Sequence, residues 1–177
     1  MKKIIALGAV LVAVLGGIYF GSAYWATSNL KDAVLSGDSL QIERAVDFPS
    51  VRESLKSQMT QALTDKMEND PELADNPFAG LGMLLAPAII DTAIDAYVTP
   101  EGLAKAMQGK RPNEESESAS EDVAFDYETE WVDSDLFRVR ILDEDTGEAG
   151  PSLIFERRGF ATWKLIKLEL PPETFAE

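Results

Sequence analysis

The amino-acid sequence predicts an α+β fold: an N-terminal transmembrane or signal helix, then four or five helices packed on a four-stranded antiparallel β-meander. Two lysines and an apolar run begin the chain, helix-capping patterns recur through its middle, and period-2 alternation marks its last third. We expect a membrane anchor or signal segment at 1–26, a helical half at 27–109, an acidic linker at 110–122, and a sheet half of the same domain at 123–177.

The first segment predicts a helix that crosses a membrane. Lys2 and Lys3 precede an apolar run at 4–20. This run exceeds the ~7–15 residues of a signal-peptide core and reaches the low end of the ~17–25 residues that span a bilayer. The lysines favour the cytoplasmic side, which places the rest of the chain across the membrane. Cleavage near Ala23 is the alternative, because the small residues at 21–23 suit a signal peptidase.

Small residues recur every four positions in this segment, and the last two are Gly17 and Gly21. Such a stripe lies along one face of a helix and would let a second helix approach closely. It predicts a homodimer or a transmembrane partner. The alternative is that alanine and glycine are simply common in membrane segments.

Capping signals divide the first part of the helical half. Gly37 is expected to end a helix, and Asp38 begins a short one. The segment 47–49 interrupts it, because a proline disfavours helix at the preceding residue. Ser50 and Glu53 then form a capping box for a longer helix.

Two more helices are expected before the linker. The uncharged stretch 77–90 is too short to span a membrane, so it predicts a buried core helix first and an interfacial segment second. Thr99, Pro100 and Glu101 supply an N-cap, a proline at the first helical position and an acid in the first turn.

The next segment predicts a hairpin whose register is set on both faces. Apolar and charged residues alternate through 123–131 and again through 137–141. A turn around Ser134 aligns apolar residues on one face and opposite charges on the other. The expected pairs are Trp131–Phe137, Thr129–Val139, Tyr127–Ile141, Glu130–Arg138 and Glu128–Arg140.

A second hairpin is centred on Phe160. It places Arg157 opposite Trp163, close enough for a cation–π contact. In this register several apolar residues crowd the face that should be wet, so either a bulge flips part of the pair or something covers the face. Those proposed as an interaction surface are Ile154, Ile166 and Leu168.

Composition excludes several chemistries. The chain has no His and no Cys, which removes thiol and imidazole catalysis, disulfides and the usual zinc sites. The net charge is −15, and −17 once Lys2 and Lys3 are set aside, so nucleic acid is not an expected partner. Asp91 and Asp95 are one helical turn apart, but they read better as a solvated stripe than as a metal or proton-sharing pair. We therefore expect no enzyme activity, no metal and no cofactor.

Two weaker motifs are also set aside. The acidic residues at 143–145 hint at a calcium turn but fail the EF-hand pattern. Ser28 and Lys31 match the S-x-x-K pattern of serine acyl-transfer enzymes without either companion motif.

Several blocks resemble an uncharacterised bacterial family, domain of unknown function 2939. The most specific are Val46–Pro49 with Val51-Arg52, and Val98–Leu103; the resemblance extends from about Tyr24 to Pro171. It implies a Gram-negative envelope protein with no assigned activity, hence a single-pass inner-membrane protein facing the periplasm, or a periplasmic one after cleavage. Asp47 and Arg52 lie in the most family-like block, where an ion pair between them would fix the start of the long helix, with a ligand site as the alternative.

Three functions remain open at this stage. The first is a non-enzymatic, membrane-tethered module that binds a protein partner. The second is a domain that binds a lipid or another small apolar ligand in a pocket between sheet and helices. The third, a carboxylate-dependent enzyme, has the least support because only Asp, Glu, Tyr, Lys and Ser could handle protons.

Overall fold

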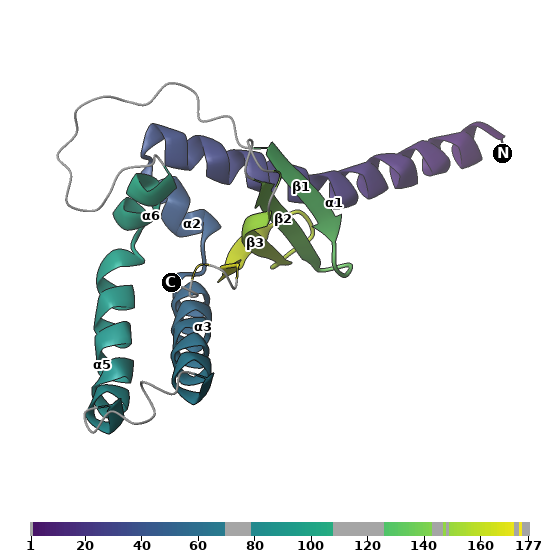
Figure 1. Ribbon diagram of the computed structural model, residues 1–177. Coiled ribbons are helices and arrows are strands. Elements are labelled where there is room, and N and C mark those ends of the chain that lie inside the picture. Colours follow the sequence, from purple (N-terminus) through teal and green to yellow (C-terminus); the bar gives the residue numbers. More distant parts are fainter. Residues whose placement is uncertain are drawn as a thin grey trace.

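The computed structural model confirms the α+β fold class and describes residues 2–69, 79–107, 126–142, 147, 149–171 and 174. A long N-terminal helix lies against one antiparallel sheet, and a helical hairpin projects from the other side of the molecule (Figure 1). The predicted acidic linker and the acidic turn at 143–145 lie outside the described residues.

Helix α1 (Lys2–Ser36) is continuous through position 26, where the sequence placed the end of the anchor. Its first half extends beyond the rest of the molecule with exposed apolar side chains, whereas its second half covers the sheet (Figure 1). Within the described part of the chain, α1 is long and apolar enough to cross a membrane. Gly37 ends it at a φ of +68°, as predicted, with the amide of Asp38 bonded to the Ala33 carbonyl.

The sheet consists of β1 (Asp126–Trp131), β2 (Leu136–Leu142), β3 (Ala149–Arg157) and β4 (Trp163–Glu169), in that order and antiparallel throughout. All five predicted pairs between β1 and β2 are confirmed. The pairing of Arg157 with Trp163 is also confirmed. A register shift follows at Ile166, and it turns Leu168 opposite Leu153 and against the core.

The main core lies between α1 and the sheet. Its largest fully buried side chains come from both layers and from the short helix α2 (Ser39–Ala45), which follows α1. Burying them removes apolar surface from water, at about 25 cal/mol per Å². These side chains are Val34, Ile42, Phe137, Phe155 and Leu165.

Helix α3 (Phe48–Asn69) starts three residues earlier than the sequence predicted, so the capping box at Ser50 is wrong. The amide of Ser50 instead donates to the carboxylate of Asp47, the residue before the helix. Pro49 fits within the first turn, where it removes no intrahelical hydrogen bond. Phe48 is buried, which favours the earlier start.

Helix α5 (Ala79–Tyr97) packs along α3, and α6 (Pro100–Met107) follows it. The amide of Gly102 donates to the Thr99 hydroxyl, which confirms the predicted cap. The expectation that the apolar stretch before Ile90 forms a buried core helix is wrong for its described part. Ile90 and Ile94 are buried, but most of the preceding apolar side chains are exposed.

Candidate functional site at the helix–sheet junction

A buried cation joins α1 to the sheet. The Arg157 side chain is 6% exposed, and its guanidinium carbon lies 3.6 Å from the ring centroid of Tyr19 on α1 and 4.2 Å from that of Trp163 on β4. A cation held between two ring faces is attracted by both, the more so when shielded from water. The predicted contact with Trp163 is confirmed, whereas sequence reasoning missed Tyr19.

Hydrogen bonds complete this junction. Arg157 Nη1 donates to the Phe160 carbonyl at 2.9 Å and to the Tyr19 carbonyl at 3.2 Å. The indole nitrogen of Trp163 donates to the Ser22 hydroxyl at 2.9 Å, and that hydroxyl donates to the Tyr19 carbonyl. The buried donors of the junction therefore have acceptors, several of them on α1.

Residues 19–23 are consequently part of the folded domain. Ala23 is fully buried, and Ser22 is the hydrogen-bond acceptor of a core tryptophan. The bond after Ala23, the predicted cleavage position, lies inside a helix that packs on the sheet. Cleavage there would remove Tyr19 and Ser22 and leave Arg157 without its α1 partners.

A second cluster joins α3 to α5. Lys56 Nζ lies 3.1 Å from Asp95 and 3.5 Å from Asp91, while Arg52 donates two hydrogen bonds to the Val98 carbonyl. The hydrogen bond to Asp95 is the main cause that raises the pKa of Lys56 above its ordinary value. The two aspartates thus face a lysine, so they hold the two helices together.

In the part of the hairpin that the structure describes, α5 presents an exposed apolar face. Leu84 is 79% exposed, and Leu81, Leu85 and Ile89 are each more than half exposed. The four side chains lie at helical spacing. Together they leave an apolar area on the order of 400 Å², a size at which surface patches commonly mark an interaction site.

The two glycines of the predicted stripe lie on α1, Gly17 before the turn that packs on the sheet and Gly21 within that turn. No atom lies within 4 Å of the position that a Cβ would take at Gly17 or Gly21. Both positions are therefore open to a neighbour.

The apolar residues of the last hairpin do not form an exposed patch. Ile154 is buried, and Ile166 and Leu168 are half-buried. The bulge turns Leu168 to the core, and α3 packs beside β4. Of the two possibilities left open by the sequence, the bulge is confirmed.

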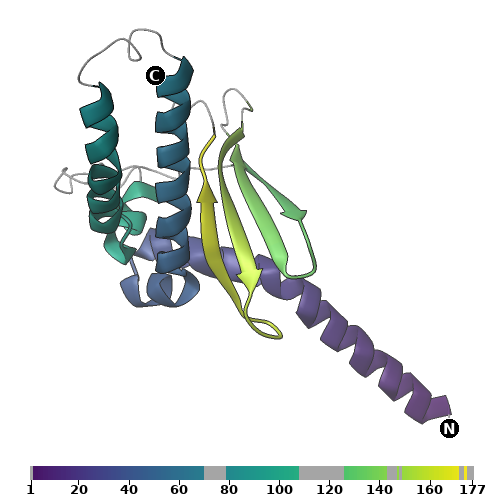
Figure 2. The ribbon, with the colours of Figure 1, turned by 90° about the horizontal axis from the view of Figure 1, so that it is seen from below.

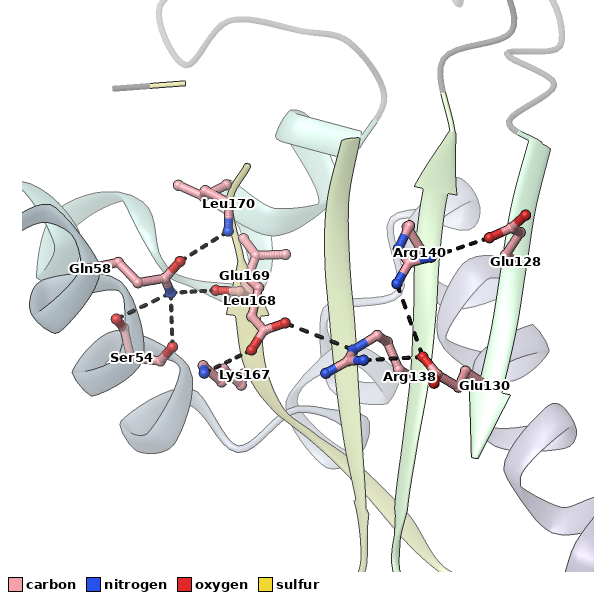
Figure 3. Close-up of polar contacts among 10 residues, drawn as sticks. All are labelled: Ser54, Gln58, Glu128, Glu130, Arg138, Arg140, Lys167, Leu168, Glu169 and Leu170. Atoms are coloured by element: carbon pink, nitrogen blue, oxygen red, sulfur yellow. Dashed lines mark hydrogen bonds and ion pairs between the residues drawn. The ribbon is translucent and has the colours of Figure 1, made fainter. Parts of the chain in front are cut away.

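The outer face of the sheet carries a ladder of paired charges instead (Figure 3). Arg138 lies 3.1 Å from Glu130 and 3.8 Å from Glu169, and Arg140 lies 3.2 Å from Glu128. Arg138 and Arg140 each have acidic partners, so neither guanidinium carries an uncompensated charge.

Gln58 of α3 bonds to the edge of β4, as Figure 3 also shows. Its amide nitrogen donates to the Leu168 carbonyl at 2.7 Å, and its oxygen accepts from the Leu170 amide at 3.0 Å. One side chain thus substitutes for a neighbouring strand. It protects part of the edge from pairing with another chain.

An apolar cleft lies between α1 and the inner face of the sheet, lined by Leu30, Val34, Tyr127, Ile141 and Leu153 among others. Its volume is about 90 Å³, well below the ~300 Å³ at which small-molecule pockets begin. Among the described residues, no group of three or more acidic side chains could hold a metal ion.

The family model described as protein of unknown function (DUF2939) matches residues 12–106 of this sequence. The chain belongs to the DUF2939 family. No curated protein and no solved structure matches it.

The matched region of the DUF2939 chain contains α1 from Val12 onward, then α2, α3 and α5, and all but the last residue of α6. Two of its blocks have clear structural roles. Asp47 caps α3 and pairs with Arg158, whereas Arg52 bonds to Val98, so the ion pair expected between Asp47 and Arg52 is wrong. Arg52 lies more than one turn of α3 beyond the cap at Asp47. Both side chains instead have partners in other elements.

Gly102 explains the Thr-Pro-Glu-Gly block of this DUF2939 protein. A Cβ at that position would lie 1.9 Å from the Tyr97 carbonyl oxygen, so only glycine fits the corner between α5 and α6. The sheet blocks of the resemblance lie beyond residue 106 and therefore outside the matched region.

Proposed function

We propose that this protein is a non-enzymatic, single-pass envelope protein of the inner membrane that faces the periplasm and presents the α3–α5 hairpin to a protein partner. The observation that carries the proposal is the exposed apolar face of α5, defined by Leu81, Leu84, Leu85 and Ile89. The family assignment adds no activity to it.

Retention of the anchor is supported by the junction at Arg157. Because Tyr19 and Ser22 hold the guanidinium and the Trp163 indole, the folded domain uses residues that cleavage near Ala23 would remove. The span and the domain would then move as one body, and the tether would set the distance between the hairpin and the bilayer.

The position of the hairpin supports a partner outside the membrane. Figure 2 shows the free ends of α3 and α5 at the opposite end of the molecule from the N-terminus of α1. If α1 crosses a bilayer, the apolar face of α5 is held away from that bilayer. A lipid surface is therefore a poor occupant for this face.

The charges beside α5 indicate the chemistry of the partner. An open groove along α3 that reaches Asp91 of α5, with a volume of about 540 Å³, is lined by Glu53 and Asp65, while Lys56 and Asp91 are already paired. An amphipathic helix with an apolar face and flanking lysines or arginines would complement both the exposed leucines and these carboxylates.

Site-specific photo-crosslinking in membranes of the source organism tests the proposal. A photoreactive phenylalanine analogue at Leu84 should give a discrete adduct, mapped to an apolar segment with basic flanks, and the double variant Leu81→Gln, Leu85→Gln should abolish it. The same probe at Leu40, which is 66% exposed on α2, is the matched control. Adducts at Leu84 that are absent, formed only with lipid, or equal to those at Leu40 would overturn the proposal.

A further inference from the structure

We propose that the turn between β3 and β4, residues 158–162, enters the membrane interface beside α1, with Phe160 as its lipid-contacting side chain. The ring of Phe160 is 55% exposed at the tip of a short turn, between Gly159 and Ala161. This inference rests on α1 crossing a bilayer, and its occupant is the headgroup region of that same bilayer.

The turn is fixed to one level of α1. The rings of Phe160 and Tyr19 lie 5.7 Å apart, and Arg157 donates hydrogen bonds to the backbone carbonyls of both residues. Since the guanidinium is also packed on the Tyr19 ring, the depth of Tyr19 sets the depth of Phe160.

The length of the helix places that level within the membrane. Lys3 and Tyr19 are sixteen residues apart in α1, which corresponds to about 24 Å at 1.5 Å per residue. The hydrocarbon core is about 30 Å thick. With Lys3 at the cytoplasmic boundary, Tyr19 therefore lies just inside the far boundary, and tilting the helix places it deeper.

The surface around this level has the composition of an interface. Phe20, Tyr24 and Trp25 are exposed on α1 near Tyr19, and Val132 is exposed in the β1–β2 turn, which also reaches α1 through the contact of Phe20 with Trp131. Aromatic side chains of this kind concentrate at the membrane–water boundary.

The charged neighbours limit how deep the turn can go. Asp135 pairs with Arg157 and is itself exposed, and Arg158 is paired with Asp47 and Glu156. Carboxylates and guanidinium groups stay hydrated at the headgroup level, so the turn inserts its aromatic ring and leaves these groups in the interface.

The absence of cysteine allows a clean test. Nitroxide labels are attached to Phe160→Cys and Ala161→Cys variants of the full-length chain in phosphatidylcholine–phosphatidylglycerol nanodiscs. For each label, the collision rate with oxygen is divided by the collision rate with a water-soluble nickel chelate. Val12→Cys marks the span, and Leu40→Cys marks an exposed residue of the domain. The oxygen-to-nickel ratio at 160 or 161 should be several-fold above that at 40 and below that at 12.

The controls separate this inference from the tether itself. If the oxygen-to-nickel ratios of the labels at positions 160 and 161 equal that at position 40, while the label at position 12 lies inside the bilayer, the inserted turn is overturned and the membrane span stands. A water-exposed label at 12 would overturn the span, and the inserted turn with it.

Discussion

Replacing Arg157 with methionine should separate α1 from the sheet more than any surface substitution would. Methionine keeps much of the length of the side chain but loses the charge. The change removes the charge-assisted hydrogen bonds to the carbonyls of Tyr19, Ser134 and Phe160, of which those to Tyr19 and Phe160 are the shorter. It also removes the cation–π contacts with Tyr19 and Trp163. The ion pair with Asp135 adds little, because that carboxylate is 62% exposed.

The magnitude follows from these contacts. Hydrogen bonds to a charged group contribute about 1.5–3 kcal/mol each, and a shielded cation–π contact contributes up to about 2 kcal/mol. The lower desolvation cost of the neutral methionine offsets part of that loss. We therefore expect Arg157→Met to lower the free energy of unfolding by about 2–4 kcal/mol.

The assay is urea unfolding of the full-length chain in a nonionic detergent, followed by tryptophan fluorescence. The matched control is Arg158→Met, because the neighbouring arginine is 45% exposed and forms only surface ion pairs, worth less than about 1 kcal/mol. Arg157→Lys should fall between the two, since it keeps the charge but loses the planar fork. Equal midpoints for the Arg157→Met and Arg158→Met chains would refute the role assigned to the junction.

Three further predictions concern the helices. Gly102→Ala should cost about 3 kcal/mol, because its Cβ meets the Tyr97 carbonyl, whereas Gly82→Ala at an open helical position should be neutral or stabilising; urea midpoints check both. Gln58→Ala should cost about 1–2 kcal/mol and speed hydrogen exchange at the edge of β4, and unchanged exchange there would contradict the edge-capping role. Because the pKa of Lys56 is raised in the folded state, its ion pairs contribute fully to stability below about pH 10.5, and this contribution is lost as the pH rises through the higher folded pKa. A Lys56→Met chain should therefore lose less stability at alkaline pH than the unmodified chain in the same unfolding assay.

The sheet could be predicted from the sequence because two independent patterns agree. In the first hairpin the apolar pairs and the charged pairs require the same register, and a shift by one residue would break both. The second hairpin lacks that agreement beyond Phe155, because the bulge at Ile166 depends on how β4 packs against α3. Local pattern alone therefore left two possibilities there.

The helical half was harder to predict in its details. Asp47 and Ser50 are equally good caps by residue type, and the burial of Phe48 favours the former. The apolar stretch of α5 shows that hydropathy gives the tendency of a segment to be covered but not the identity of what covers it. In the described structure, α3 covers one face of α5, and the face that contains Leu84 stays open.

The end of the anchor shows the same limit more clearly. Lipid and protein core both favour apolar side chains, so a hydropathy run cannot show where one replaces the other. The spacing of the buried side chains can. Ala23, Leu30, Ala33 and Val34 recur on one side of α1, while residues 2–15 are exposed on all sides. One-sided burial begins near Ser22, one helical turn after Tyr19, whose carbonyl accepts a hydrogen bond from Arg157. The span and the domain therefore share the turn of helix between Tyr19 and Ala23. A sharp boundary at 26 would assign that turn to the membrane alone, and the buried guanidinium would then lose the ring and the carbonyl that it binds.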